Sequence, residues 1–87
     1  MPMLCKFLGI YIYMVFNDKG RHNQPHLHAK CGGKEVVVSL DGKILAGSLP
    51  KNKLRSLLVW MRLHTDELHV NWQLAKNLQP FNKIKPL

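Results

Sequence analysis

Turns that contain glycine divide the first half of the chain into short stretches of β-forming residues. Residues 6–16 (KFLGIYIYMVF) are rich in Ile, Tyr, Val and Phe, with apolar side chains on both faces, which is typical of a central strand. Three more strands are predicted at 26–30, 34–40 and 43–46. Cys31-Gly32-Gly33 favours one tight turn and Asp41-Gly42 a second, because glycine adopts positive φ at no steric cost. We therefore expect a small antiparallel β-meander of about four strands over residues 1–47.

The spacing of apolar residues changes from that of a strand to that of a helix after residue 47. Ser48 is typical of a helix N-cap, and Pro50 is typical of a first helical turn. Apolar side chains then recur at helical spacing along one stripe, at Leu54, Leu57, Leu58 and Met61. Thr65 or Asp66 can cap a second helix, which Pro80 ends. That helix carries apolar residues on one side, at Leu68, Trp72 and Ala75.

These elements predict an α+β fold in a single domain over residues 1–87. The domain is expected to consist of the β-meander (1–47), a helical pair packed on one sheet face (48–79) and a basic tail (80–87). The tail either packs along the sheet or stays loose.

Aromatic residues are expected to serve the core in this fold. Trp60 and Trp72 each fall within a helix, where they would lock the helices onto the sheet rather than stack on bases. Tyr11 and Tyr13 alternate along the first strand, and we expect core positions for them rather than the lining of a groove.

Net charge is the strongest global signal. The chain has 13 Lys and Arg against 5 Asp and Glu, a formal net charge of +8. This balance favours a polyanion such as RNA or DNA, or an acidic protein partner. No apolar run is long enough to span a bilayer, and the first residues lack the basic leader and small-residue cleavage site of a signal peptide. We expect a cytoplasmic protein with no membrane partner, in which Cys5 and Cys31 are free thiols.

The most specific local pattern is the pair His26 and His28, one residue apart and directly after Pro25. The period of a strand puts both side chains on one face, where they can share a metal ion, act as acid and base, or form a polar outer surface. A metal site requires a third ligand, and the candidates are His22, Asp18, Cys31, His64 and His69. We expect no cofactor, because a single HxH pattern is a weak metal signal.

A cationic surface around the two histidines would suit nucleic-acid chemistry. Histidine moves protons near neutral pH, as cleavage at the 2′-hydroxyl of RNA requires, and Lys or Arg can hold the phosphate. The sequence leaves open whether the chain is an enzyme. As a metal-independent ribonuclease it would use His26 and His28 as acid and base, with Arg21 and Lys30 on the phosphate. The predicted nucleic-acid-binding residues are Arg21, Lys30, Lys34, Lys51, Lys53 and Arg55.

Nearly the whole chain resembles a small bacterial family filed as a domain of unknown function (number 4160). The motifs that carry the resemblance are YxYMVFND, PHLHAKCGGKEVVVSLDGKILAGSLP and LLVWMRLHTDELHVNWQLA. Members are commonly encoded beside another small domain, so the resemblance implies one half of a toxin–antitoxin module. The residues it marks are Asn17, Asp18, Pro25, His26, His28, Gly33, Trp60, His64, Glu67 and Trp72. The turn before the histidines is longer and more basic here than in many relatives, with Lys19, Gly20, Arg21 and His22.

The leading hypothesis is a small basic protein that binds or acts on RNA or DNA. It would be the toxin-like member of a bacterial two-gene pair and would be held by a small acidic protein partner. One alternative is a non-catalytic module that binds DNA or a protein. Another is a metal-binding protein in which His26 and His28 hold the ion with His22 or Asp18.

Overall fold

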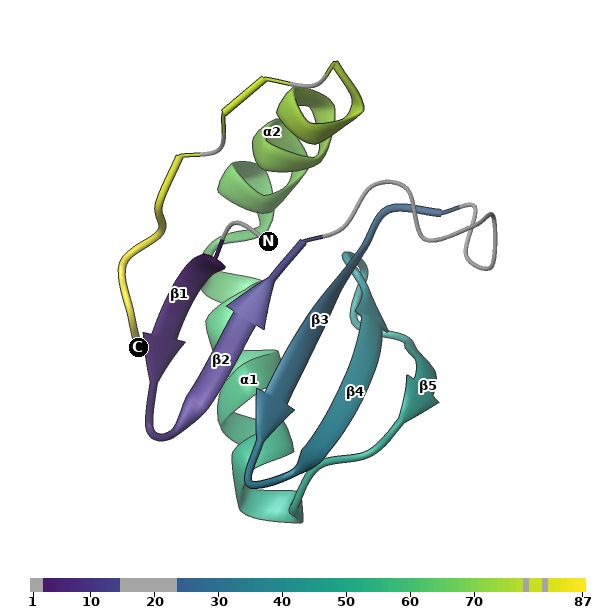
Figure 1. The fold of residues 1–87 in the computed structure, drawn as a ribbon, viewed down its shortest axis with the longest axis vertical. Coiled ribbons are helices and arrows are strands. Elements are labelled where there is room, and N and C mark those ends of the chain that lie inside the picture. The colour runs from purple at the N-terminus through teal and green to yellow at the C-terminus, as the bar shows by residue number, and fades with distance from the viewer. Residues whose placement is uncertain (1–2, 15–23, 78, 81) are drawn as a thin grey trace.

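The computed structural model describes residues 3–14, 24–77, 79–80 and 82–87. Its five-stranded antiparallel sheet keeps the strands in sequence order: β1 (Met3–Phe7), β2 (Ile10–Tyr13), β3 (His26–Cys31), β4 (Lys34–Ser39) and β5 (Ile44–Gly47). Two helices follow, α1 (Lys51–Leu63) and α2 (Thr65–Lys76). The predicted α+β fold is confirmed, with five strands where about four were expected (Figure 1). None of the helices in this described part of the chain is long and apolar enough to cross a membrane.

The extra strand arises because the predicted strand 6–16 is interrupted after Phe7. Leu8 and Gly9 form a two-residue turn, and both have positive φ, 51° and 76°. Such a turn matches the twist of the two flanking strands, and Gly9 adopts this conformation freely. For Leu8 the left-handed backbone costs about 1–2 kcal/mol, which is why the sequence favoured one continuous strand.

The glycine turn between β3 and β4 is confirmed. Gly32 and Gly33 have φ of 55° and 83°, and they place Lys34 opposite Cys31. The turn after β4 also contains a positive-φ glycine, Gly42, and closes with a hydrogen bond from the backbone N–H of Ser39 to the carbonyl of Lys43.

The start of α1 differs from the expected one. Ser48 is not the N-cap; its backbone N–H donates to the carbonyl of Glu35 in β4 at 3.1 Å. Pro50 occupies the cap position without a side-chain hydrogen bond. Gly47 lies so close to Glu35 that a Cβ there would overlap the Glu35 carbonyl oxygen.

The period of two in the strands separates a core face from an outer face. Core residues on the strands are Ile10, Ile12, Leu27, Ala29, Val36 and Val38, and they form one cluster with Leu57, Trp60 and Met61 of α1. Figure 1 shows α1 behind the sheet, on this face. The outer face carries the alternate residues: Tyr11, Tyr13, His26, His28, Lys30 and Glu35.

The second helix and the C-terminal segment close one side of the fold. α2 lies past the end of the sheet at which β3 begins (Figure 1), and Trp72 and Leu68 join the core cluster. The burial expected for Trp60 and Trp72 is therefore confirmed.

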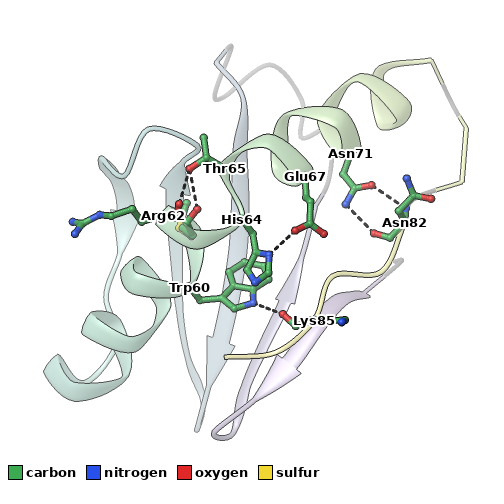
Figure 2. A network of polar contacts seen from close by, with 9 residues as sticks. Trp60, Arg62, His64, Thr65, Glu67, Asn71, Asn82 and Lys85 are labelled. Atoms are coloured by element: carbon green, nitrogen blue, oxygen red, sulfur yellow. Dashed lines mark hydrogen bonds and ion pairs between the residues drawn. The ribbon is translucent and has the colours of Figure 1, made fainter.

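The basic tail packs along β1 rather than staying loose. The backbone N–H of Ile84 donates to the carbonyl of Leu4 at 3.1 Å, and Ile84 is buried. Trp60 Nε1 donates to the carbonyl of Lys85 at 2.8 Å. The side chain of Asn71 both donates to the Asn82 carbonyl (2.8 Å) and accepts from the Asn82 N–H (2.9 Å), as Figure 2 shows.

We expect Asn71→Ala to lower the free energy of unfolding by about 2 kcal/mol, because it removes two hydrogen bonds of a buried amide. Urea unfolding followed by circular dichroism measures the change. Asn52→Ala, at an exposed position of α1, is the matched control and should change stability by less than about 0.5 kcal/mol. Equal stabilities of the two variants would show that the Asn71–Asn82 contact does not anchor the tail.

Candidate functional site

His26 and His28 lie on the same face of β3, as the strand period predicts, and their ring centroids are 5.4 Å apart. They differ sharply in exposure. His26 is fully buried, its Nδ1 lies 2.8 Å from the carbonyl oxygen of Gln24, and its ring lies 5.2 Å from that of Trp72. Of the pair, His28 is the more exposed imidazole, with 14% of its side chain accessible, although its Nε2 atom is buried.

A glutamate and a tyrosine hold the ring of His28. His28 Nδ1 lies 3.0 Å from Glu35 Oε2 on the neighbouring strand, β4. On the other side, β2 places the ring of Tyr13 opposite His28, and the two rings stack with centroids 5.4 Å apart and planes 15° apart. The ring therefore has a defined orientation on the sheet.

Glu35 Oε2 also accepts a hydrogen bond from the hydroxyl of Tyr13, at 2.5 Å. This hydrogen bond is the largest cause of the lowered pKa of Glu35. His28 and Lys30 lower the pKa further, and partial burial acts in the opposite direction. Burial, followed by the hydrogen bond and the charge of Glu35, raises the pKa of Tyr13 well above its usual range. Glu35 is therefore an ionised acceptor and Tyr13 a neutral donor.

This arrangement orients the imidazole. A carboxylate beside one ring nitrogen fixes the tautomer and the orientation of the ring. The sequence pattern did not single out Glu35, and Tyr13 was expected in the core. Tyr13 is indeed buried, but on the outer face of the sheet, with its hydroxyl on Glu35.

A metal site receives no support from the described residues. Nowhere in residues 3–14, 24–77, 79–80 and 82–87 do three or more His, Cys, Asp or Glu side chains come together in a way that could hold a metal ion. Cys31 packs against the core cluster on the opposite face of β3. His64 is hydrogen-bonded to Glu67 in the helical half (Figure 2). The candidate ligands His22 and Asp18 lie outside the described residues.

Most of the predicted nucleic-acid-binding residues belong to one end of the molecule. Figure 1 shows the β1–β2 turn, the β3–β4 turn and the first turn of α1 at the same end of the sheet. The first turn of α1 contacts the β1–β2 turn directly, because Lys53 Nζ donates to the carbonyl of Leu8 at 2.7 Å. The cations in or next to these segments are Lys6, Lys30, Lys34, Lys51, Lys53 and Arg55, and we call this group the basic end. Arg21, the remaining predicted residue, lies outside the described residues.

The basic end continues onto the outer face of the sheet as a row across four strands. The strand register places Lys6 beside Tyr11, Tyr11 beside Lys30 and Lys30 beside Glu35. The ammonium of Lys6 lies 4.8 Å from the ring centroid of Tyr11, and that of Lys30 lies 5.3 Å from the ring centroid of Tyr13. Tyr11 was expected in the core, but 43% of it is exposed.

Three described acidic residues lie away from this end. Asp41 follows β4 at the opposite end of the sheet, and Asp66 and Glu67 are in the first turn of α2. The charge of the described chain is therefore unevenly distributed. Cations are concentrated at the basic end, where Glu35 is the only described acidic residue nearby.

The residues marked by the family resemblance form two groups. His26, His28 and Trp72 meet beside the start of β3, through the ring contacts given above. Trp60 and His64 meet at the end of α1, with ring centroids 5.3 Å apart, and His64 Nδ1 lies 2.6 Å from Glu67 Oε1 (Figure 2). Gly33 forms the β3–β4 turn, whereas Asn17 and Asp18 lie outside the described residues.

Comparison with known proteins gives a family match. The family model described as Domain of unknown function (DUF4160) matches residues 9–73, which include all of β2 to α1 and most of α2. No curated protein and no solved structure matches the chain.

We expect Tyr13→Phe to raise the pKa of Glu35 toward its ordinary value, because the Tyr13 hydroxyl contributes most to lowering it. Carbon-detected NMR titration of the Glu35 carboxyl measures this pKa. Since folding lowers the Glu35 pKa, its ionised form stabilises the fold above the ordinary carboxyl pKa, and this stabilisation is lost as the pH falls through the folded-state value. The stability of Tyr13→Phe should therefore depend less on pH in the acid range.

Tyr11→Phe is the control for this titration, because Tyr11 is not hydrogen-bonded to Glu35 in the network described above. It should leave the Glu35 titration unchanged. A Glu35 pKa that is the same in wild-type protein and in Tyr13→Phe would contradict the assigned hydrogen bond.

Proposed function

We propose a function from geometry and charge, since the chain belongs to the DUF4160 family and the description of that family names no activity. The chain binds RNA or DNA through its basic end. The observation that carries this proposal is the convergence of three separate segments, two hairpin turns and the first turn of α1, each of which brings cations to the same end (Figure 1).

The physical basis is the release of counterions. Each Lys or Arg that neutralises a phosphate frees a condensed cation, and this term supplies most of the affinity of sequence-independent binding. The first turn of α1 adds to the attraction, because it contains no acidic residue and its backbone N–H groups carry partial positive charge. Glu35 is the acidic side chain of the outer row, and Tyr13 and His28 already engage it.

In a cell, such a protein would act as the toxin-like member of a bacterial two-gene pair. The family resemblance supports this role, and so does the charge of +8, which a small acidic partner would neutralise. Both proteins would work in the cytoplasm, where the nucleic acid is. A partner that covers the basic end would compete directly with RNA or DNA.

We expect replacement of Lys30, Lys34 and Lys51 by Gln to weaken binding at least about tenfold at low salt, because three potential phosphate contacts are lost. Fluorescence anisotropy with labelled RNA and DNA oligonucleotides measures the affinity over a series of salt concentrations. The slope of log affinity against log salt should fall by about 0.7–0.9 for each phosphate contact removed.

The control removes the same charge from the opposite end, by Lys43→Gln, Arg62→Gln and Lys76→Gln together. These residues are exposed and belong to the β4–β5 turn, the last turn of α1 and the last turn of α2. Replacing these three cations should weaken binding only through the lower net charge of the protein, because no phosphate contact is removed. If the two triple variants bind equally, the basic end is not the binding surface.

Cleavage of RNA is a second candidate function, favoured by the orientation of His28 on Glu35. His28 would act as the general base that takes the 2′-hydroxyl proton, which requires its buried Nε2 to become accessible when RNA binds. The 2′-oxygen would attack the phosphorus, the 5′-oxygen would leave with a proton from water, and Lys30 would stabilise the negative charge that develops on the phosphate. The buried His26 would not touch the substrate. With Trp72 it would position the His28 ring, which revises the acid–base pair expected from the sequence.

We expect His28→Gln to reduce the rate of RNA cleavage at least about a hundredfold while RNA binding persists, since Gln keeps polarity at the site but cannot serve as the base. Gel analysis of end-labelled RNA measures cleavage, and anisotropy measures binding. His69→Gln, an exposed histidine on α2, is the control. Equal cleavage by wild-type protein and His28→Gln would exclude His28 as the base, and binding without any cleavage would leave the chain as a non-catalytic binder.

A further inference from the structure

We infer that the ligand of the basic end is single-stranded nucleic acid, with one unpaired base stacked on the ring of Tyr11. This inference rests on the proposed function and specifies the class of nucleic acid that the same surface takes. Its starting point is an exposed aromatic residue in a strand, surrounded by lysines.

Tyr11 differs from the other aromatic side chains of the outer face and the helices. Tyr13, Trp60 and Trp72 are all buried, whereas 43% of Tyr11 is exposed. The core face of β2 is occupied by Ile10 and Ile12, so the alternate residue Tyr11 projects from the opposite face. An exposed aromatic ring on a sheet surface is a stacking platform for a nucleobase, because every base presents an apolar face.

Lysines flank the ring on both neighbouring strands. Lys6 of β1 pairs with Tyr11 in register and keeps its ammonium 4.8 Å from the ring centroid. Lys30 of β3 pairs with Tyr11 from the other side. A base that stacks on Tyr11 can displace the Lys6 ammonium from the ring, and both ammonium groups then lie close to the phosphates that flank this base.

The same geometry disfavours a duplex. In a duplex the faces of interior bases are covered by their neighbours in the stack, so a ring on a strand cannot reach them without unpairing, which costs a few kcal/mol per step. Tyr11 also lies on the sheet rather than on a helix or a projecting ribbon that would enter a groove. An unpaired strand offers base faces and phosphates together, which matches the alternation of aromatic ring and lysines in this row.

The test compares four labelled ligands of equal length and matched sequence by fluorescence anisotropy at one salt concentration: single-stranded RNA, single-stranded DNA, the RNA–DNA duplex of complementary strands, and a DNA strand that carries abasic sites. Wild-type protein should bind the single strands more tightly than the duplex and the abasic strand. Comparison of the RNA and DNA strands then identifies which single strand is the ligand.

Tyr11→Ala should weaken binding to the single strands by about five- to a hundredfold, because one base stack is lost, and should leave the slope of affinity against salt unchanged. Tyr11→Phe keeps the ring and should bind as wild type does. Because Tyr11 is exposed, both variants are expected to fold, and circular dichroism checks this.

The inference is overturned if Tyr11→Ala binds single strands as tightly as wild type, or if wild type binds the duplex and the abasic strand as well as it binds single strands. In either case, binding that still depends on the lysines of the basic end would leave the proposed function intact. The absence of binding to all four ligands would overturn the proposed function as well.

Discussion

The register between β2, β3 and β4 decides which side chains meet in this molecule. Tyr13 lies opposite His28, and Lys30 lies opposite both Tyr11 and Glu35. A slip of one residue in any of these pairings would turn the whole set toward α1 and bring the core residues to the surface. The burial of Leu27 and Ala29 under α1 therefore holds His28 and Lys30 in place from the other side of the same strand.

The two faces of each strand serve different purposes, which suits a small domain. One face supplies the apolar burial that a chain of 87 residues needs, and the other is available for polar contacts. The tail adds to stability by covering β1, through the Ile84–Leu4 and Trp60–Lys85 hydrogen bonds. Neither the tail nor β1 lies within residues 9–73, so the part of the chain that matches the family contains Tyr13, His28, Glu35 and the basic end apart from Lys6.

Part of the site follows from the sequence alone. The two-residue turn at Gly32–Gly33 pairs Lys30 with Glu35, and counting outward from the turn places His28 diagonally across from Glu35 on the same face. The contact between Tyr13 and Glu35 does not follow, because the long connection between β2 and β3 leaves their register open. Tyr11 and the extra hairpin were missed for a related reason, since a leucine at positive φ gives no turn signal of its own. The convergence of the lysines at the basic end depends on where α1 starts relative to two hairpins, which is a property of the tertiary structure.

The most direct test of the account is to map the nucleic-acid contact on the protein itself. Amide chemical shifts of nitrogen-15-labelled protein, recorded during titration with a single-stranded oligonucleotide, report which backbone groups lie near the ligand. The account predicts changes in the β1–β2 turn, the β3–β4 turn, Tyr11 and the first turn of α1, with α2 and the β4–β5 turn unchanged. Changes centred on α2 or on the β4–β5 turn would contradict it, as would unchanged shifts throughout the sheet under conditions in which the oligonucleotide is bound.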